Sequence, residues 1–267
     1  MTTLTVDQAP VHARPAGFLA DCRSIAGRAI RAVPREVEVV VPALVVPVFF
    51  FAINIGSLEK LAEAGTGVDF KAFQLPVAIT FAVTGISRAS ALVTDIQDGY
   101  FDRLLMTPIR RLSLLLGLMM ADFALVVALT IPVIVMGLAV GVRFETGLLG
   151  VPLFMLMAGL WGLAFTGFPY AIALKTGNPA AVNTSFILFF PFMFLTTSFL
   201  PREALTGWLS AIAGWNPVTY LLAGMRSLLY GGWDARSIAG GFAAIAIVGT
   251  VSMTLAFLAL RGRLRRN

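Results

Sequence analysis

Residues 112–141 have the sequence LSLLLGLMMADFALVVALTIPVIVMGLAVG, in which Asp122 is the one charged side chain. A helix needs about 20 mainly apolar residues to cross the hydrocarbon core of a bilayer. This stretch is longer than that, so it predicts a transmembrane helix that is tilted to fit the bilayer. The chain is therefore expected to be an integral membrane protein.

The composition of the whole chain agrees with a membrane protein. Of its 267 residues, 58% are hydrophobic and 13% are charged, and the mean hydropathy is +0.87. A soluble domain carries about 25% charged residues, so a soluble enzyme and a disordered chain are excluded. The pI is about 10.1, but the basic residues lie mainly between apolar runs, which excludes a nucleic-acid-binding domain. With one cysteine, Cys22, and one histidine, His12, no intrachain disulfide or metal site is expected.

Five further apolar runs extend the prediction to an all-α protein with six transmembrane helices. The predicted spans are about residues 37–57, 73–94, 112–141, 147–174, 180–200 and 238–260. Pro42 and Pro47 lie inside the first span, where neighbouring helices can satisfy the carbonyls that proline leaves without a donor. No internal repeat is visible, which argues against an inverted-repeat transporter.

The two ends of the chain are polar or basic. Residues 1–17 form a polar tail that does not resemble a signal peptide, and 261–267 form a basic tail, so 18–260 make up one membrane domain. Residues 18–35 mix arginines with apolar residues, which favours an amphipathic helix at the membrane surface; a solvated basic lead-in is the alternative.

The positions of lysine and arginine predict the orientation. With the N-terminus inside, thirteen of these residues fall in cytoplasmic segments and six in external ones, and cytoplasmic loops carry the excess in membrane proteins. Both termini are therefore expected in the cytoplasm, in a bacterial plasma membrane.

The connection between the second and third spans, residues 95–111, has the sequence DIQDGYFDRLLMTPIRR. Tyr100, Leu104 and Leu105 have helical spacing, and Pro108 ends the pattern. We expect a short helix across the cytoplasmic ends of the two spans, where a soluble partner can dock. A solvated connection without a partner remains the alternative.

Residues 201–236 are too polar for a full span and too apolar for a plain loop. Two apolar stretches, about 204–213 and 218–230, are separated by Asn216-Pro217, a pair that favours a turn. We expect a helical hairpin that enters the outer leaflet and returns; an amphipathic external loop is the alternative. An interfacial aromatic belt would consist of Trp208, Trp215, Tyr220, Tyr230 and Trp233.

Two ionisable residues, Arg88 and Asp122, fall within predicted spans. Such residues are functional candidates because burying a charge is expensive. We expect Arg88 to reach toward the headgroups or to pair with Asp122. A structural pair is favoured over a proton relay because no chain of acidic residues or histidines continues from Asp122.

Motifs for catalysis are missing from the sequence. It has no HExxH, GxSxG or CxxC pattern, and no GxxxxGK[ST] loop for the phosphates of ATP. We therefore expect a protein that is not itself an enzyme and binds no cofactor.

Two segments resemble a known family, the ABC-2 type membrane subunits of ATP-binding-cassette exporters, in particular the daunorubicin-resistance-like drug and lipid permeases. DIQDGYFDRLLMTPIRRLSLLLG, residues 95–117, is similar to the stretch that follows the second span in that family. SFLPREALTGWLSAIAGWNPVTYLLAGMRSLLYG, residues 198–231, is similar to its Leu-Pro…Trp-Leu…Asn-Pro-Val-Thr…Arg-x-Leu-Leu pattern.

The resemblance implies a role for each segment. Residues 18–35 would be the connecting helix, 95–111 the coupling helix on a separate ATPase subunit that binds ATP and Mg²⁺, and 201–236 external re-entrant helices. Two permeases would pair, as a homodimer or with a homologous subunit. The implied coupling residues are Asp95, Asp98, Tyr100, Asp102, Arg103, Leu104, Leu105 and Pro108. The implied residues of the external hairpin are Pro201, Trp208, Trp215, Asn216, Pro217, Tyr220 and Arg226.

The cargo expected for such a permease is hydrophobic or amphipathic, because the spans hold almost no polar residues. A cluster of phenylalanines in residues 186–199 either faces this path or, for most of the rings, faces lipid. Export of lipid-linked polysaccharide is an alternative within the family. From other classes, an ion-coupled secondary transporter or channel would depend on Asp122 and Arg88, and a membrane-embedded enzyme would need a clustered site that the sequence does not offer.

Overall fold

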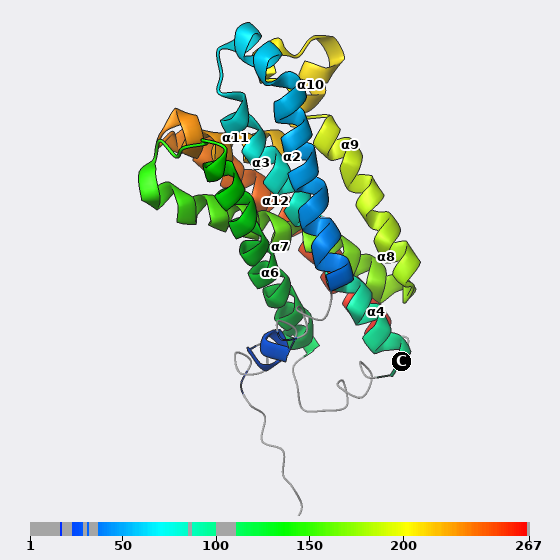
Figure 1. Cartoon of the computed structure of the whole chain (residues 1–267). Coiled ribbons are helices and arrows are strands. Elements are labelled where there is room, and N and C mark those ends of the chain that lie inside the picture. Colours follow the sequence, from blue (N-terminus) through cyan, green and yellow to red (C-terminus); the bar gives the residue numbers. More distant parts are fainter. Residues whose placement is uncertain are drawn as a thin grey trace, which may run out of the picture.

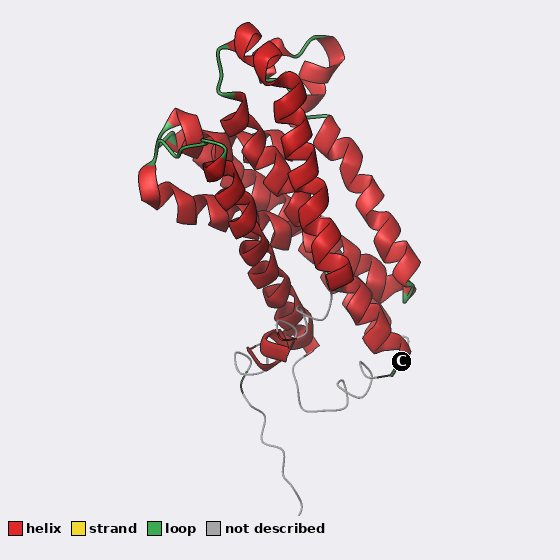
Figure 2. Ribbon diagram, in the orientation of Figure 1, coloured by secondary structure: helices red, strands yellow, loops and turns green. Residues whose placement is uncertain are grey.

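The computed structural model describes residues 17, 23–28, 31, 37–84, 87–99 and 111–265. Across these ranges the chain forms helices joined by turns and contains no strand (Figure 1, Figure 2). Five helical stretches in this part are long and apolar enough to cross a membrane: Val41–Lys60, Phe70–Gln97, Leu115–Ala139, Gly147–Thr176 and Ala235–Arg263. The expected all-helical membrane architecture is confirmed at this level.

The elements follow one another in this order: α2 (Val37–Thr66), α3 (Phe70–Thr84), α4 (Ala89–Gln97), α6 (Arg111–Ala139), η2 (Gly147–Leu149), α7 (Gly150–Thr176), α8 (Pro179–Ser185), η3 (Phe186–Leu188), α9 (Phe189–Phe194), η4 (Arg202–Ala204), α10 (Gly207–Trp215), α11 (Pro217–Arg226), η5 (Ser227–Gly231) and α12 (Ala235–Leu264). The described N-terminal helix, 23–28, and the end of α12 lie at the same end of the bundle (Figure 1).

The first helix is longer than its predicted span. α2 continues through residues 58–66, which were expected to be loop, because Glu59, Lys60 and Glu63 favour helix. It ends where the N–H of Gly67 donates to the carbonyl of Glu63 at 2.8 Å, with Gly67 at a φ of 66°. This left-handed position, which glycine adopts without strain, is a common helix stop.

The second predicted span, 73–94, is two helices rather than one. α3 and α4 are separated around Ser87 and Arg88, neither of which is helical. Side chains replace the missing backbone hydrogen bonds there. The Ser87 hydroxyl accepts from the N–H of Ala89 at 3.1 Å, and the carboxylate of Asp122 in α6 accepts from the N–H of Arg88. Ser87 thus supplies a local acceptor that the apolar pattern does not reveal.

The fifth predicted span, 180–200, is also shorter than expected. Helical structure runs from Pro179 to Phe194 through α8, η3 and α9, and residues 195–200 are bends. In this region Thr196, Thr197 and Ser198 are buried, and their hydroxyls and carbonyls bond to neighbouring elements. Six full-length spans are therefore not present in the described part of the chain, which holds five long apolar stretches, one of them divided into α3 and α4, and this shorter helical run.

Small residues bring the long helices into close contact. A side chain at Gly167 of α7 would lie 2.6 Å from the backbone of Ser252 in α12, and the Ser252 hydroxyl donates to the carbonyl of Ala164. On α6, a side chain at Gly137 would lie 2.8 Å from Leu75 of α3. Such close approach is the usual role of glycine in packed membrane helices.

Two buried apolar clusters stack along the bundle. The larger contains Leu75, Trp161 and Leu222 and holds α3, α7 and α11 together. The smaller contains Leu92 of α4 and Tyr170 of α7 and lies nearer the end with the chain termini. α4 is thus packed against the bundle separately from α3.

Candidate functional site

The region expected to couple to an ATPase begins on α4. Asp95 is half-buried and forms an ion pair with Arg28 of the N-terminal helix at 3.6 Å, and Ile25 of that helix is buried in the apolar cluster that also contains Ile96 of α4. At the end of α4 the N–H of Asp98 donates to the carbonyl of Thr94 at 2.9 Å. The structure therefore joins the described parts of residues 18–35 and 95–111.

The remaining predicted coupling residues lie outside the described residues. These are Tyr100, Asp102, Arg103, Leu104, Leu105 and Pro108. Their role stays a prediction.

The start of α4 is held by the intramembrane carboxylate. One oxygen of Asp122 in α6 accepts the backbone N–H of Arg88 at 3.1 Å, and the other accepts the hydroxyl of Tyr170 in α7 at 2.9 Å. Asp122 is fully buried and the Arg88 side chain is 7% exposed. The structure thus brings the two predicted residues together, through the Arg88 backbone, and adds Tyr170 as a third member.

The other end of α4 is fixed to the α7–α8 turn. The Gln97 side chain donates to the carbonyl of Gly177 at 3.0 Å. Near the start of α4, the hydroxyl of Ser90 donates to the side-chain oxygen of Asn183 in α8 at 3.2 Å. α4 is therefore attached to α6, α7 and α8 by polar bonds as well as by its apolar face.

At the opposite end of the bundle, residues 201–236 form two helices that are broken at Asn216-Pro217 as predicted. The Asn216 side-chain oxygen accepts the N–H of Val218 at 3.0 Å, which caps α11. Its amide nitrogen donates to the carbonyls of Phe192 at 2.6 Å and Leu195 at 3.0 Å. One side chain thus joins the start of α11 to the end of α9.

The aromatic residues of this region divide into exposed and partly buried ones. Trp208 and Trp215 of α10 are 68% and 90% exposed, and Tyr220 donates its hydroxyl to the carbonyl of Gly214 at 2.7 Å. Tyr230 is partly buried and packs against the larger apolar cluster. These positions fit an aromatic surface on α10, and the depth of α10 and α11 in a membrane stays a prediction.

Arg226, which the sequence places among external charges, is in fact buried at 5% exposure. Its guanidinium donates from Nε to the carbonyl of Phe73 at 3.1 Å, and from Nη1 and Nη2 to the hydroxyl and carbonyl of Thr197 at 2.9 and 2.8 Å. It also lies 3.4 Å above the centre of the Phe73 ring. Arg226 therefore connects α11, α3 and the bend after α9.

A second polar group holds the same bend. The Gln74 side chain of α3 donates to the carbonyl of Ser198 at 3.0 Å. Sequence reasoning missed Tyr170, Thr197, Gln74 and Ser198, because each finds its partner far away in the chain. The signal that was present is the run of small polar residues, TTS, at 196–198 inside an apolar stretch.

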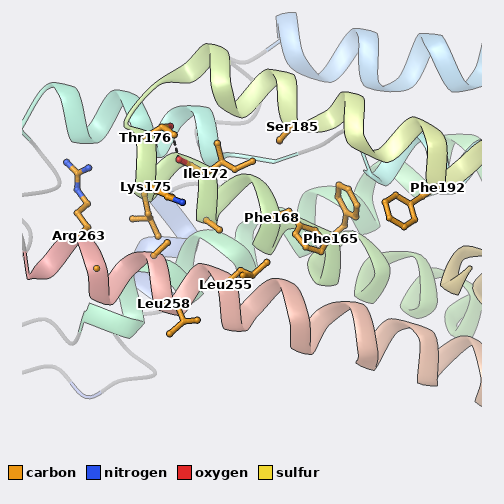
Figure 3. Close-up of a pocket in the computed structure, with 14 residues that line it drawn as sticks. Phe165, Phe168, Ile172, Lys175, Thr176, Ser185, Phe192, Leu255, Leu258 and Arg263 are labelled. Carbon is orange, nitrogen blue, oxygen red and sulfur yellow. Dashed lines mark hydrogen bonds between the residues drawn. The ribbon is translucent and has the colours of Figure 1, made fainter.

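An apolar cavity of about 890 Å³ lies between α7, α8–α9 and α12 (Figure 3). Phe165, Phe168 and Phe192 lie toward one end of the drawn group, and Lys175 and Arg263 toward the other. Of the phenylalanines predicted to face a path or lipid, Phe189 is buried, whereas Phe192 is half exposed.

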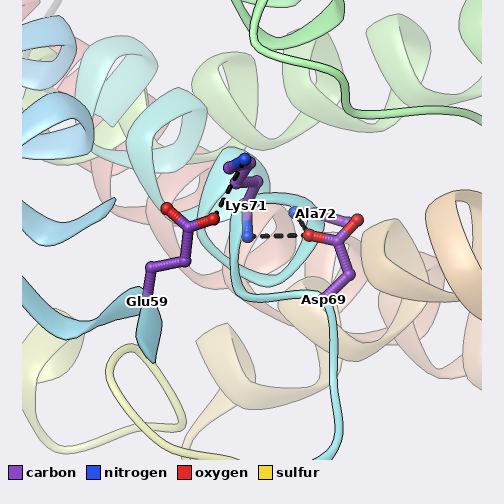
Figure 4. A network of polar contacts seen from close by, with 4 residues as sticks. All are labelled: Glu59, Asp69, Lys71 and Ala72. Carbon is purple, nitrogen blue, oxygen red and sulfur yellow. Dashed lines mark hydrogen bonds and ion pairs between the residues drawn. The ribbon is translucent and has the colours of Figure 1, made fainter. Parts of the chain in front are cut away.

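A polar contact closes the turn between α2 and α3 at the α10 end of the bundle. Lys71 forms an ion pair with Glu59 at 3.0 Å, and the Asp69 carboxylate accepts the N–H groups of Lys71 and Ala72 at 3.0 and 3.2 Å (Figure 4). Asp69 therefore caps α3.

Asp234 caps α12 in the same way, and hydrogen bonds from Ser237 and the Arg236 backbone lower the pKa of Asp234.

The family model for ABC-2 type transporters matches residues 22–230, a range that holds α4, the segment after it and the α10–α11 pair. The chain belongs to the ABC-2 type transporter family. It is a multi-pass membrane protein.

Curated relatives of this ABC-2 family member are drug-resistance permeases. The daunorubicin resistance ABC transporter permease protein DrrB1 of Streptomyces coeruleorubidus is 29% identical over 211 residues, which cover 77% of this chain and 72% of the relative. The probable doxorubicin resistance ABC transporter permease protein DrrC of Mycobacterium tuberculosis is 25% identical over 202 residues, covering 74% and 72%. The chain is thus similar to ABC permeases of the drug-resistance type.

Proposed function

We propose that this chain is the permease subunit of an exporter that moves a hydrophobic or amphipathic molecule out across the plasma membrane. A separate ATPase subunit would hydrolyse ATP, since the sequence contains no P-loop. The observation that carries the proposal is the family match over residues 22–230 together with relatives named as drug-resistance permeases.

α4 is the proposed lever between the ATPase and the membrane helices. It leads into the predicted coupling segment, and the Arg28–Asp95 ion pair at 3.6 Å attaches the N-terminal helix to it. It is separated from α3 at Ser87 and Arg88, so a push on the coupling segment can turn α4 without bending a continuous helix. The bonds of Asp122 then carry that motion into α6 and α7.

The surroundings of Asp122 support an ATP-driven exporter over an ion-coupled transporter. A proton relay needs a carboxylate that exchanges protons with water, yet Asp122 is fully buried. Both of its oxygens accept hydrogen bonds from protein groups, at 3.1 Å from the Arg88 N–H and at 2.9 Å from the Tyr170 hydroxyl. Such a carboxylate suits a structural role.

The proposal also includes pairing of two permeases and an orientation with both termini in the cytoplasm. The orientation rests on the excess of lysine and arginine in the segments at the terminal end of the bundle. The pairing rests on the family resemblance.

Transport by inverted membrane vesicles tests the proposal. Inverted vesicles from cells that express the chain together with a candidate ATPase subunit are mixed with a fluorescent apolar dye, and uptake of the dye is followed with ATP, with a non-hydrolysable ATP analogue, and with a protonophore. We expect uptake that requires hydrolysable ATP and resists the protonophore. Uptake that the protonophore abolishes, and that persists without ATP, would overturn the proposal.

A further inference from the structure

The cavity of about 890 Å³ has an opening on the outer surface of the bundle. Phe192 of α9 and Leu255 and Leu258 of α12 line it and are 53%, 44% and 56% exposed. Its size is that of a small-molecule site. Because α12 is long and apolar enough to cross a membrane and α9 is apolar, we infer that this opening faces the hydrocarbon of the bilayer, where a lipid chain can enter it.

The charge of the cavity is confined to one end and has one sign. Lys175 and Arg263 line it there, each in the last turn of its helix, and in Figure 3 they lie at the opposite end from the phenylalanines. None of the residues that line it is acidic. The two cations therefore favour an anionic group at the membrane surface.

The length of the apolar part matches one leaflet. Along α7 the lining runs from Phe165 to Lys175, about 15 Å at the helical rise. The hydrocarbon core of a bilayer is about 30 Å thick, so one leaflet contributes about 15 Å. An acyl chain can thus extend from the cationic end to the phenylalanines.

We propose that this cavity binds an anionic phospholipid, with an acyl chain between α7, α9 and α12 and the phosphate between Lys175 and Arg263. The lipid belongs to the leaflet that meets these two residues, which is the cytoplasmic leaflet in the orientation proposed above. Bound there, it fills the gap beside the broken fifth helix and holds α9 against α12. The site lies within one subunit and does not depend on which cargo the permease moves.

Lipid retention by the purified full-length chain tests the proposal. The protein is extracted in mild detergent with its natural partners and mixed with equal amounts of phosphatidylglycerol and phosphatidylcholine that carry identical acyl chains. Native mass spectrometry then counts the lipid that stays bound. We expect the wild type to retain phosphatidylglycerol about tenfold more than phosphatidylcholine, because two cations favour a headgroup with net negative charge over a zwitterionic one, whose choline offsets the phosphate.

The variant K175Q/R263Q should lose most of this preference, to about twofold or less. The matched control is R261Q/R265Q, which removes the same charge from exposed positions on the same stretch of α12 that do not line the cavity. It should keep the wild-type ratio. Equal retention by all three proteins, or an equal loss in both double variants, would overturn the proposal.

A variant that fills the cavity provides a second test of where the lipid binds. Ala259 lines the cavity and is partly buried, so A259W should reduce retention of both lipids severalfold while the protein still elutes as a single species. If A259W retains both lipids like the wild type, the bound lipid lies elsewhere. If the wild type retains neither lipid because a second copy of the chain covers this face, the proposal is wrong.

Discussion

Two buried polar residues connect elements that the apolar packing leaves separate. Asp122 accepts from the start of α4 and from α7, and Arg226 donates to α3 and to the bend after α9. In a low-dielectric interior such bonds are strong, and their loss leaves the remaining partners poorly satisfied. We expect both residues to act through position, without contact to a transported molecule.

Replacement of Asp122 tests whether its hydrogen bonds stabilise the bundle. D122A removes the acceptor for two buried donors, the Arg88 N–H and the Tyr170 hydroxyl, each worth about 1–3 kcal/mol. We expect the melting temperature of the purified protein to fall by about 5 °C or more. D122N keeps one acceptor oxygen and the side-chain volume, so its melting temperature should fall by less than half as much. A D122A protein as stable as the wild type would contradict the role assigned to Asp122.

Among the helices, the side chain of Asn216 joins the end of α9 to the start of α11. N216D keeps the oxygen that caps α11 but loses the two amide bonds to the carbonyls of Phe192 and Leu195. It also places a negative charge beside those carbonyls. We expect a loss of about 2–4 kcal/mol of stability, measured as thermal denaturation of the purified chain.

The chain contains its own control for this change. Asn178-Pro179 caps α8, and its side-chain oxygen accepts the N–H of Ala180 at 2.9 Å. N178D retains that acceptor at a helix N-terminus, where a negative charge is favourable, so we expect little change. Equal effects of N178D and N216D would show that the link from Asn216 to α9 contributes nothing.

The contact between α7 and α12 depends on the absence of a side chain. G167L would force atoms to within 2.6 Å of the Ser252 backbone, and overpacking of this kind costs about 1–3 kcal/mol. G56L is the matched control, because a side chain at Gly56 of α2 would meet nothing within 4 Å. We expect G167L to lower the melting temperature by about 3 °C or more and G56L to leave it unchanged; the reverse order would show that the helices pack differently.

In the whole molecule, the sequence predicts the positions of most long apolar helices well and their interruptions poorly. The length of the apolar runs predicts the positions of α2, α6, α7 and α12. The Asn216-Pro217 pair predicts the break between α10 and α11. The break at Ser87 and the early end of the fifth span at Phe194 depend on bonds to distant residues, so a local pattern does not reveal them. For the same reason Asp122 could be singled out by its charge, whereas its partner Tyr170 could not.

Residues 95–111 are proposed to couple this permease to an ATPase subunit, and co-purification measures that association. The chain is tagged at its C-terminus, extracted in mild detergent, and the accompanying proteins are identified by mass spectrometry. We expect a P-loop ATPase that is retained by the wild type and lost from Y100D/L104D. The control L148D/L149D changes two exposed leucines of η2, 90% and 76% accessible, at the opposite end of the bundle from α4, and should retain the ATPase. A chain that purifies without any ATPase, or an ATPase that Y100D/L104D retains in full, would contradict the claim.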